Sequence, residues 1–426
     1  MRHSSFLAAS ALVGASLIGC HGADVGETQP AAAQQVATTA APKSTDLGRP
    51  FATAVANVPE NKPAFAEQTR ANEYRSTTQV TVTEVATGLR TPWALAFLPD
   101  GRMLVTEKHT GNLLIVTKDG QKSPPVAGLP KVDGRSQVGL HDVEVAPDYA
   151  ESKLIYWAYV EPRTGGNGLN VARAKLVDGP SPRIEGLQII FRAEPTLTSS
   201  MQAGGRLVFA PDGNLFVTLG DRSVQAGRVQ SRDLKSHLGK VVRIKPDGTV
   251  PSDNPFVSTP GAKPEIWSSG HRNVLGAALD ANNRLWTNEM GPRGGDELNL
   301  TVKGKDYGWP DIGYGEEYTG ARAHQSTQKA GLEQPVYYWD PVIAPSGMAI
   351  YAGDLFPEWK GNVFIGGLVS TSLVRLIVDD DKVVGEERLL RDRRERIREV
   401  VEGPDGALYL LTDATNGKLL KLTPKP

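Results

Sequence analysis

The sequence predicts an all-β fold, a six-bladed β-propeller, from a repeat, its spacing and its turn residues. A strand, a Pro-Asp-Gly turn and a second strand recur at 97–107, 209–218 and 403–413. Such turns join antiparallel strands. Weaker copies at 145–148 and 279–286, with a further strand pair over 346–366, give six units of roughly 58 residues, the scale of a propeller blade. The competing fold is an all-β sandwich array.

The first 20 residues are typical of a lipoprotein signal peptide. Arg2 and His3 precede an apolar run over 6–18, which is too short to span a bilayer. The run ends in Leu-Ile-Gly-Cys, which resembles a bacterial lipobox, and Cys20 is the only cysteine of the chain. We therefore expect lipidation at Cys20, with the protein exported and anchored to the cell envelope on a periplasm-facing membrane surface. The alternative is an ordinary signal peptide that contains a cysteine.

Two further parts follow. Residues 21–77 are rich in Ala, Thr, Gln and Pro without a sustained apolar period, which predicts a flexible tether. Residues 78–426 contain all copies of the repeat and are expected to form the propeller. The formal net charge of −1 provides no electrostatic attraction for nucleic acid.

Propellers bind ligands on loops at the mouth of the central channel, so polar clusters near strand starts are the candidate site. Arg272 and Asn273 precede a strand, and a guanidinium beside an amide suits a planar anion or a quinone oxygen. Residues 288–299 combine glycines with Asp296 and Glu297, which suits calcium, although they lack EF-hand spacing. A solvated strand start and a plain turn are the simpler interpretations.

Two other clusters involve arginine and histidine. Arg396 and Arg398 lie two residues apart, so on a strand they share one face and can clamp carboxylates, although a dense charge run is most often solvated surface. Gln137 and His141 form a polar entry into a strand, where a lone histidine is more often packed than catalytic.

These segments together resemble the PQQ-dependent soluble sugar dehydrogenases, particularly their aldose sugar dehydrogenase branch. The matching phrases run in family order over about residues 80–424: GGRLVFAPDGNLFVTLGDR, HLGKVVRIKPDG, PEIWSSGHRN, GPRGGDELNL followed by YGWP, and YYWDPVIAPSGM. The resemblance implies a six-bladed propeller that carries pyrroloquinoline quinone (PQQ) and calcium. It implies oxidation of an aldose sugar at C1 to the lactone, with electrons passed to an external acceptor.

The resemblance also assigns roles to particular residues. Arg272 and Asn273 are implied to hold the reactive edge of the quinone, with Gln137 above the cofactor. The other implied contacts are Arg396 and Arg398 to the carboxylates of PQQ, the carbonyls of Gly291 and Pro292 to one calcium, Glu297 with the backbone of Tyr307 to a second calcium, and Tyr318 near the cofactor.

One position departs from the family in a way that bears on activity. The family has its catalytic histidine four residues before the arginine of the G-G-R-L phrase, and Gln202 stands there. A neutral amide can hydrogen-bond a hydroxyl but cannot accept its proton. Two more positions depart from the family. Met290 stands where the aldose sugar dehydrogenase branch more often has histidine or glutamine, and Leu275 stands where it often has glutamine.

Three hypotheses follow. The first is a dehydrogenase with another proton acceptor, for which His141 is the nearest candidate in the sequence. The second is a non-catalytic propeller lipoprotein that binds PQQ or a sugar. The third, from another class, is a calcium-dependent lactonase-type propeller, which needs several side-chain carboxylates and an Asn around one ion.

Overall fold

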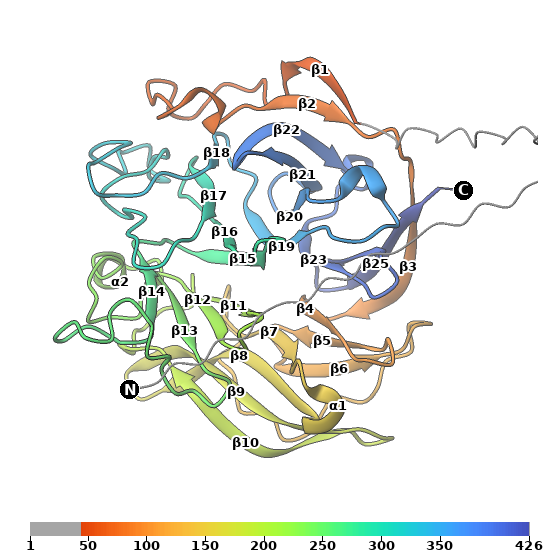
Figure 1. The fold of residues 1–426 in the computed structure, drawn as a ribbon. Coiled ribbons are helices and arrows are strands. Elements are labelled where there is room, and N and C mark those ends of the chain that lie inside the picture. The colour runs from red at the N-terminus through yellow and green to blue at the C-terminus, as the bar shows by residue number, and fades with distance from the viewer. Residues whose placement is uncertain (1–43, 426) are drawn as a thin grey trace, which may run out of the picture. The chain divides into compact units, whose positions relative to one another are not determined.

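The computed structural model describes residues 44–425, which form 25 strands in six sheets around a central axis (Figure 1). The first strand of each blade lies at the axis, and the later strands lie progressively further out. The prediction of an all-β, six-bladed propeller is confirmed. The expected signal peptide, Cys20 and residues 21–43 of the expected tether lie outside the described residues.

The blades are numbered in chain order, with strands from the axis outward. Blade 1 has β4 (Pro92–Phe97), β5 (Met103–Glu107) and β6 (Asn112–Val116). Blade 2 has β7 (Leu140–Val145), β8 (Leu154–Arg163), β9 (Gly166–Val177) and β10 (Arg183–Arg192). Blade 3 has β11 (Gly204–Phe209), β12 (Leu215–Leu219), β13 (Lys240–Ile244) and β14 (Ile266–Ser269).

Blade 4 has β15 (Val274–Leu279), β16 (Leu285–Glu289), β17 (Asp296–Leu300) and β18 (Tyr337–Trp339). Blade 5 has β19 (Pro345–Ile350), β20 (Val363–Gly367), β21 (Ser372–Asp379), β22 (Lys382–Leu389), β2 (Asn72–Arg75) and β1 (Thr45–Pro50). Blade 6 has β23 (Ile397–Glu402), β24 (Leu408–Thr412), β25 (Gly417–Pro424) and β3 (Val80–Leu89). Short helical turns are α1 (Tyr149–Ser152), α2 (Gln225–Arg228), η1 (Ala66–Gln68), η2 (Pro357–Trp359) and η3 (Arg391–Arg393).

The Pro-Asp-Gly turns join the first and second strands of blades 1, 3 and 6, as the repeat predicts. In blade 1 the turn closes through the Gly101 N–H, which donates to the Leu98 carbonyl at 2.8 Å. Asp100 accepts the N–H of Arg102 at 3.0 Å, and Gly101 has φ = 83°, a conformation that favours glycine. The aspartate and the glycine of the repeated phrase therefore have distinct roles in this turn.

Blade 6 closes the ring with strands from both parts of the sequence. β3 pairs antiparallel with β25, from Val80 opposite Pro424 to Leu89 opposite Gly417. This pairing covers the edge that β25 would otherwise expose, which removes a site for unwanted strand addition.

The residues before Thr78 are part of the folded unit from at least Ser44. β2 pairs in parallel with β22 and antiparallel with β1, so blade 5 has six strands. The buried Gln68 amide donates to the Pro335 carbonyl at 2.9 Å, and Asp340 accepts backbone N–H groups of this segment. The prediction of a flexible tether over 21–77 is therefore wrong for 44–77. The order of this segment was not predicted because its sequence has low hydrophobicity. The segment is held by backbone pairing and polar contacts rather than by an apolar face.

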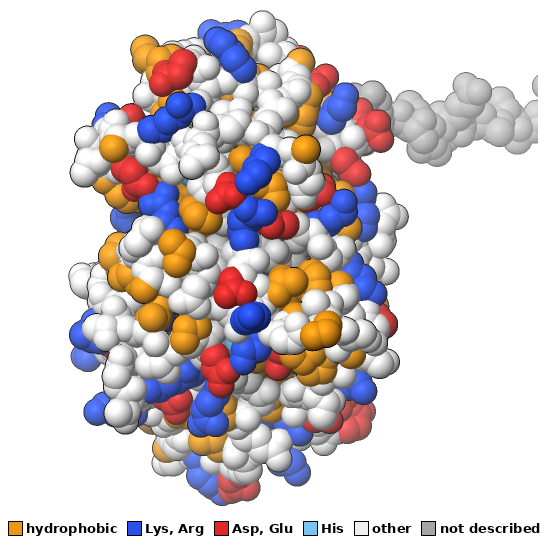
Figure 2. Space-filling view, turned by 90° about the vertical axis from the view of Figure 1, so that its left-hand side faces the viewer, with side chains coloured by type: hydrophobic (Ala, Val, Ile, Leu, Met, Phe, Trp, Pro, Cys, Tyr) orange, Lys and Arg blue, Asp and Glu red, His pale blue; other side chains and the backbone are white. Residues whose placement is uncertain are grey.

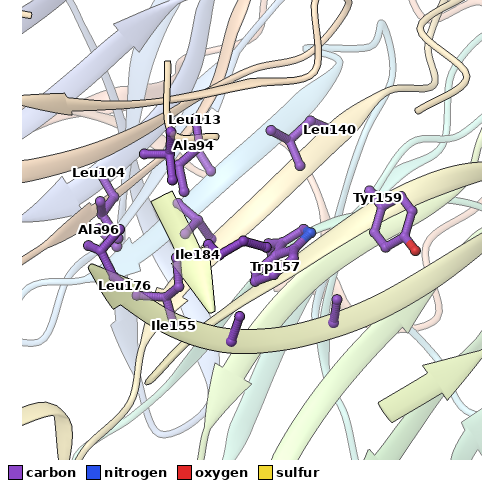
Figure 3. Close-up of a cluster of buried hydrophobic side chains, with 14 of the residues drawn as sticks. Ala94, Ala96, Leu104, Leu113, Leu140, Ile155, Trp157, Tyr159, Leu176 and Ile184 are labelled. Atoms are coloured by element: carbon purple, nitrogen blue, oxygen red, sulfur yellow. The ribbon is translucent and has the colours of Figure 1, made fainter. Parts of the chain in front are cut away.

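The hydrophobic core lies mainly between neighbouring blades. Figure 3 shows one cluster, in which Trp157 of blade 2 packs among apolar side chains that include Ala94 and Leu104 of blade 1. Because aromatic and branched side chains fill the space between blades, polar side chains on the inner strands are left to face the axis. The candidate site is built from these inner-strand residues.

The outer surface carries charges of both signs. Figure 2 shows one side of the propeller, on which Lys and Arg are interspersed with Asp and Glu. No helix within residues 44–425 has both the length and the apolar composition needed to cross a membrane.

Candidate active site

A cavity of about 370 Å³ lies at one end of the axis, and all six blades contribute to it. Its residues lie where first strands begin and second strands end. In an antiparallel pair the start of the first strand and the end of the second lie at the same end of the blade, so the six blades place these polar residues together. The cavity brings together eight of the residues that were singled out from the sequence: Gln137, His141, Gln202, Asn273, Leu275, Met290, Arg396 and Arg398.

A narrower cavity adjoins the first and shares Met290 with it. It contains the remaining predicted ligands, which are Arg272, Gly291, Pro292, Glu297 and Tyr307. Tyr318 lines neither cavity and is 70% exposed, so the structure does not place it with the other predicted residues. It lies in the long β17–β18 connection, where sequence spacing is a poor guide to position.

Arg396 and Arg398 share one carboxylate. Arg396 donates from Nε and Nη2 to one oxygen of Asp413 at 3.0 and 2.8 Å, and Arg398 donates likewise to the other at 3.2 and 2.9 Å. Burial acts to raise the pKa of Asp413, but the charges of Arg398 and Lys108 and the hydrogen bonds from Arg396 and Arg398 outweigh it and hold the pKa far below its usual range. The same-face prediction for the two arginines is thus supported, and their combined charge exceeds that of Asp413.

Gln202 lies at the cavity in a strained loop. Its φ is 47°, and Ser136 and Ala344, which also line the cavity, have φ of 51° and 52°. Left-handed backbone at non-glycine residues is uncommon and often marks a functional site. The Gln202 N–H donates to the Gln137 side-chain oxygen at 3.1 Å, whereas the Gln202 Oε1 is buried without a partner.

His141 lies at the start of β7 in the wall of this cavity. Its Nδ1 lies 2.8 Å from the Gly204 carbonyl oxygen, which can only accept, so Nδ1 carries the proton and Nε2 has a lone pair. Nε2 is buried without a hydrogen-bond partner, and the ring stacks on Trp93 with centroids 4.9 Å apart. Burial, aided by the charges of Lys108 and Arg398, lowers the pKa of His141 to about 3. The ring is therefore neutral and presents an acceptor.

The guanidinium group of Arg272 lies among the backbone carbonyls of the predicted calcium loop, residues 288–299. Arg272 donates from Nη1 to the carbonyl oxygens of Met290 and Gly291, each at 2.7 Å. Each carbonyl has two lone pairs, so this contact leaves Gly291 with capacity for a second partner. Asn273 lies beside Arg272 and accepts the Gly204 N–H at 3.2 Å, which ties this loop to the one that carries Gln202.

Asp296 and Glu297, the two carboxylates of the predicted calcium loop, have separate roles. Asp296 accepts the N–H groups of Gly291, Ile343 and Ala344 at 2.7–2.9 Å, so it organises the loops. Glu297 lies opposite Glu289 across β16 and β17, and its pKa is raised well above the usual value by burial and then by Glu289. Adjacent strand residues face opposite ways, which separates the two carboxylates.

Within residues 44–425, no three or more His, Cys, Asp or Glu side chains are grouped so as to hold a metal ion. Any ion at Glu297 would then need backbone carbonyls as well. The lactonase-type hypothesis, which requires several side-chain carboxylates at one ion, is not supported by this arrangement.

A buried charge cluster lies beneath the cavity. The Arg206 Nη1 is 2.9 Å from Asp142 and 2.6 Å from Glu399, and its guanidinium lies 4.6 Å from the Trp93 ring centre. Glu144 lies nearby. Its pKa is raised well above the usual value by loss of solvent, and further by the charges of Asp142 and Glu399. Three carboxyl groups therefore face one guanidinium, which disfavours ionisation of all three.

Glu144→Gln is expected to stabilise the protein at alkaline pH. A carboxyl whose pKa is raised by folding contributes stability below its unfolded-state pKa, and that contribution is lost as the pH rises through the folded-state value. The variant cannot ionise, so its melting temperature at pH 9 should exceed that of the parent by about 2–4 °C, and the difference should be smallest at pH 5. Thermal unfolding between pH 5 and 9 tests this, with the exposed Glu151→Gln as the control. A constant difference across the range would contradict it.

Sequence reasoning missed Trp93, Lys108 and Asp413, all of which line the cavity. Lys108 and Asp413 directly follow the second strand of a repeat copy, at Thr106-Glu107 and Leu411-Thr412. Residues just after that strand meet at one end of a propeller, so aligning the copies could have identified both. Trp93 had no comparable signal.

Comparison with known proteins places the chain among sugar dehydrogenases. The glucose/sorbosone dehydrogenase family model matches residues 89–421. The chain is 43% identical over 338 residues to aldose sugar dehydrogenase YliI of Escherichia coli (strain K12), covering 78% of this chain and 90% of that protein. The apo crystal structure of the soluble aldose sugar dehydrogenase from E. coli superposes with a TM-score of 0.78 at 43% identity, over 82% of this chain and all of that one. The PQQ-bound form of the aldose sugar dehydrogenase from Streptomyces coelicolor gives 0.67 at 28% identity, over 81% and 99%.

Proposed function

The chain belongs to the glucose/sorbosone dehydrogenase family, and from this we propose that it oxidises an aldose at C1 to the lactone with PQQ and calcium, passing electrons to an external acceptor. The observation that carries the proposal is one cavity with a cationic wall and two buried, unpartnered polar atoms, His141 Nε2 and Gln202 Oε1.

The residues of the cavity fit a tricarboxylic quinone. Arg396 and Arg398 would hold its carboxylates, and Arg272 and Asn273 its quinone edge, with Gln137 close to the sugar. Guanidinium groups suit carboxylates because both are planar and can form paired hydrogen bonds. A relative with the same fold has been solved with PQQ bound, which supports PQQ as the ligand.

Calcium fits the adjoining cavity through oxygen atoms of the protein. The carbonyls of Gly291 and Pro292 would serve an ion at the quinone. Among residues 44–425, the Asn299 amide is the only hydrogen-bond donor to the Glu297 side chain, at 3.1 Å, and with the Tyr307 carbonyl Glu297 would serve a second ion. A buried carboxylate without a cationic partner is costly, and a hard divalent cation would remove that cost.

When bound, PQQ supplies the hydride acceptor, and calcium polarises its carbonyl as a Lewis acid. The protein must take the proton of the C1 hydroxyl. His141 can accept it at Nε2, because Nδ1–H is held by the Gly204 carbonyl. Gln202 can hydrogen-bond the sugar but cannot act as the base. We propose that His141 accepts the proton in place of the residue at 202.

Binding without turnover is the second candidate function, and the amide at 202 favours it. A propeller that holds PQQ or a sugar at the membrane surface could act as a sensor without needing a base. His141 would then only pack against Trp93.

Titration of the full chain with PQQ in the presence of calcium, followed by dye reduction on a panel of aldoses, tests both candidates. The proposed enzyme binds PQQ and reduces dye only when sugar is added. PQQ binding without dye reduction supports the second candidate function. If PQQ does not bind, both the dehydrogenase and the PQQ-binding form of the second candidate are refuted.

We also propose that Cys20 is lipidated and holds the protein at the cell envelope, on the basis of the lipobox-like sequence. Cys20→Ser should move the protein from the membrane fraction to the soluble fraction and remove a lipid-sized mass from its N-terminal peptide. Mass spectrometry of both fractions decides this, and an unchanged distribution would count against the anchor.

A further inference from the structure

Lys108 is a buried lysine without a partner at the candidate active site. It directly follows β5, is 6% exposed and lines the cavity. No hydrogen bond or ion pair reaches its Nζ from any residue between 44 and 425. Lys240, the other buried lysine, donates from Nζ to three carbonyls at 2.7–3.0 Å. Lys108 therefore lacks the hydrogen bonds to protein carbonyls that Lys240 has, and its ammonium group is left for a ligand in the cavity.

The charges around Lys108 leave an excess of positive charge. Arg396 and Arg398 share the single carboxylate of Asp413, and Lys108 adds a third cation to the same cavity. Three cations and one anion leave a net charge of +2 on this wall. Such a wall is electrostatically complementary to a ligand with several negative charges.

We infer that Lys108 is a third cationic contact for the carboxylates of the cofactor, from a different blade than the arginine pair. This inference rests on the proposed function, since it presupposes a tricarboxylic ligand. Carboxylate recognition would then be divided between blade 1 and blade 6, which fixes the ligand from two sides.

The protonation of Lys108 gives the inference a pH signature. Burial, together with the charges of Arg398 and Arg396 and partly offset by Asp413, lowers the pKa of Lys108 to about 8. His141 faces Lys108 from β7 and is neutral throughout the relevant range. Lys108 is therefore charged at pH 7 and loses its proton above about pH 8, whereas the arginines keep theirs, so affinity for an anion should fall as the pH rises.

Binding of PQQ to the full chain at fixed calcium, followed by quenching of tryptophan fluorescence between pH 7 and 9.5, tests the inference without requiring turnover. Lys108→Met is expected to weaken binding about 10- to 100-fold at pH 7, the range for one charge-assisted hydrogen bond. The parent should lose roughly 10-fold affinity across the pH range, and Lys108→Met should show little change. Lys108→Arg should bind with little pH dependence.

Lys118→Met is the matched control, because Lys118 is exposed and belongs to the same blade. Circular dichroism checks that each variant is folded. Equal affinity and equal pH dependence in the parent and Lys108→Met would overturn the role of Lys108 while leaving the proposed function intact. A parent that does not bind PQQ would overturn both.

Discussion

Gln202→His is expected to raise the turnover of an aldose, by less than the roughly 10²–10⁴-fold that a positioned general base contributes, because His141 already offers a proton acceptor in the parent. The position lies at the cavity, and its side-chain oxygen is buried without a partner, so an imidazole there would meet the sugar directly. Histidine also tolerates left-handed backbone, which Gln202 adopts with φ = 47°. Steady-state dye reduction with PQQ and calcium measures the change.

The control for this prediction is Gln202→Asn, which keeps an amide and gains no base. It should leave turnover at or below the parental value. If Gln202→His binds PQQ as well as the parent and shows no gain, position 202 is not where the hydroxyl proton leaves in this protein.

His141→Ala is expected to reduce turnover about 10²–10⁴-fold while changing PQQ affinity only a few-fold. The reason is the loss of Nε2, the one buried histidine acceptor lining this cavity that has no partner among the described residues. Because removal of a ring stacked on Trp93 also leaves space in the core, His141→Gln serves as a second variant that keeps most of the volume. Stopped-flow measurement of sugar oxidation separates this step from reoxidation by the dye.

The double variant Gln202→His/His141→Ala separates a proton acceptor from a packing residue. If His141 only supports the fold, its loss should cost as much in the Gln202→His protein as in the parent. If it accepts the proton, the histidine at 202 should largely replace it. Turnover retained in the His141 single variants would refute the role.

The fold could be predicted because the repeat is local. Strand, turn and strand are specified within about ten residues of sequence, and Gly101 and Asp100 act in the turn as the phrase indicates. The same holds for Arg396 and Arg398, whose spacing is enough to place them on one face. The structure of residues 44–77 could not be predicted in this way, because β2 is held by β22, more than 300 residues away.

Much of the candidate site was predicted from the polar loop clusters and from the family resemblance that assigned them roles. Gln137, Gln202 and Asn273 do lie together, linked through backbone N–H groups of the Gln202 loop. Lys108 and the separation of Asp296 from Glu297 were missed for a different reason. Lys108 stands out only when the repeat copies are aligned, and Asp296 and Glu297 separate only once both are assigned to one strand, β17.

The closure of blade 6 has a consequence for the order in which the protein is made. A chain is synthesised from its N-terminus, so β3 is complete long before β25 exists, and β2 likewise precedes β22. β2 has an unpaired edge until β22 emerges, and β3 has one until β25 emerges at the end of the chain, and other chains could join these edges. A chain released without its final ten residues should therefore aggregate more than a chain that lacks a surface loop of equal length, because the ring would be left open between β3 and the missing β25.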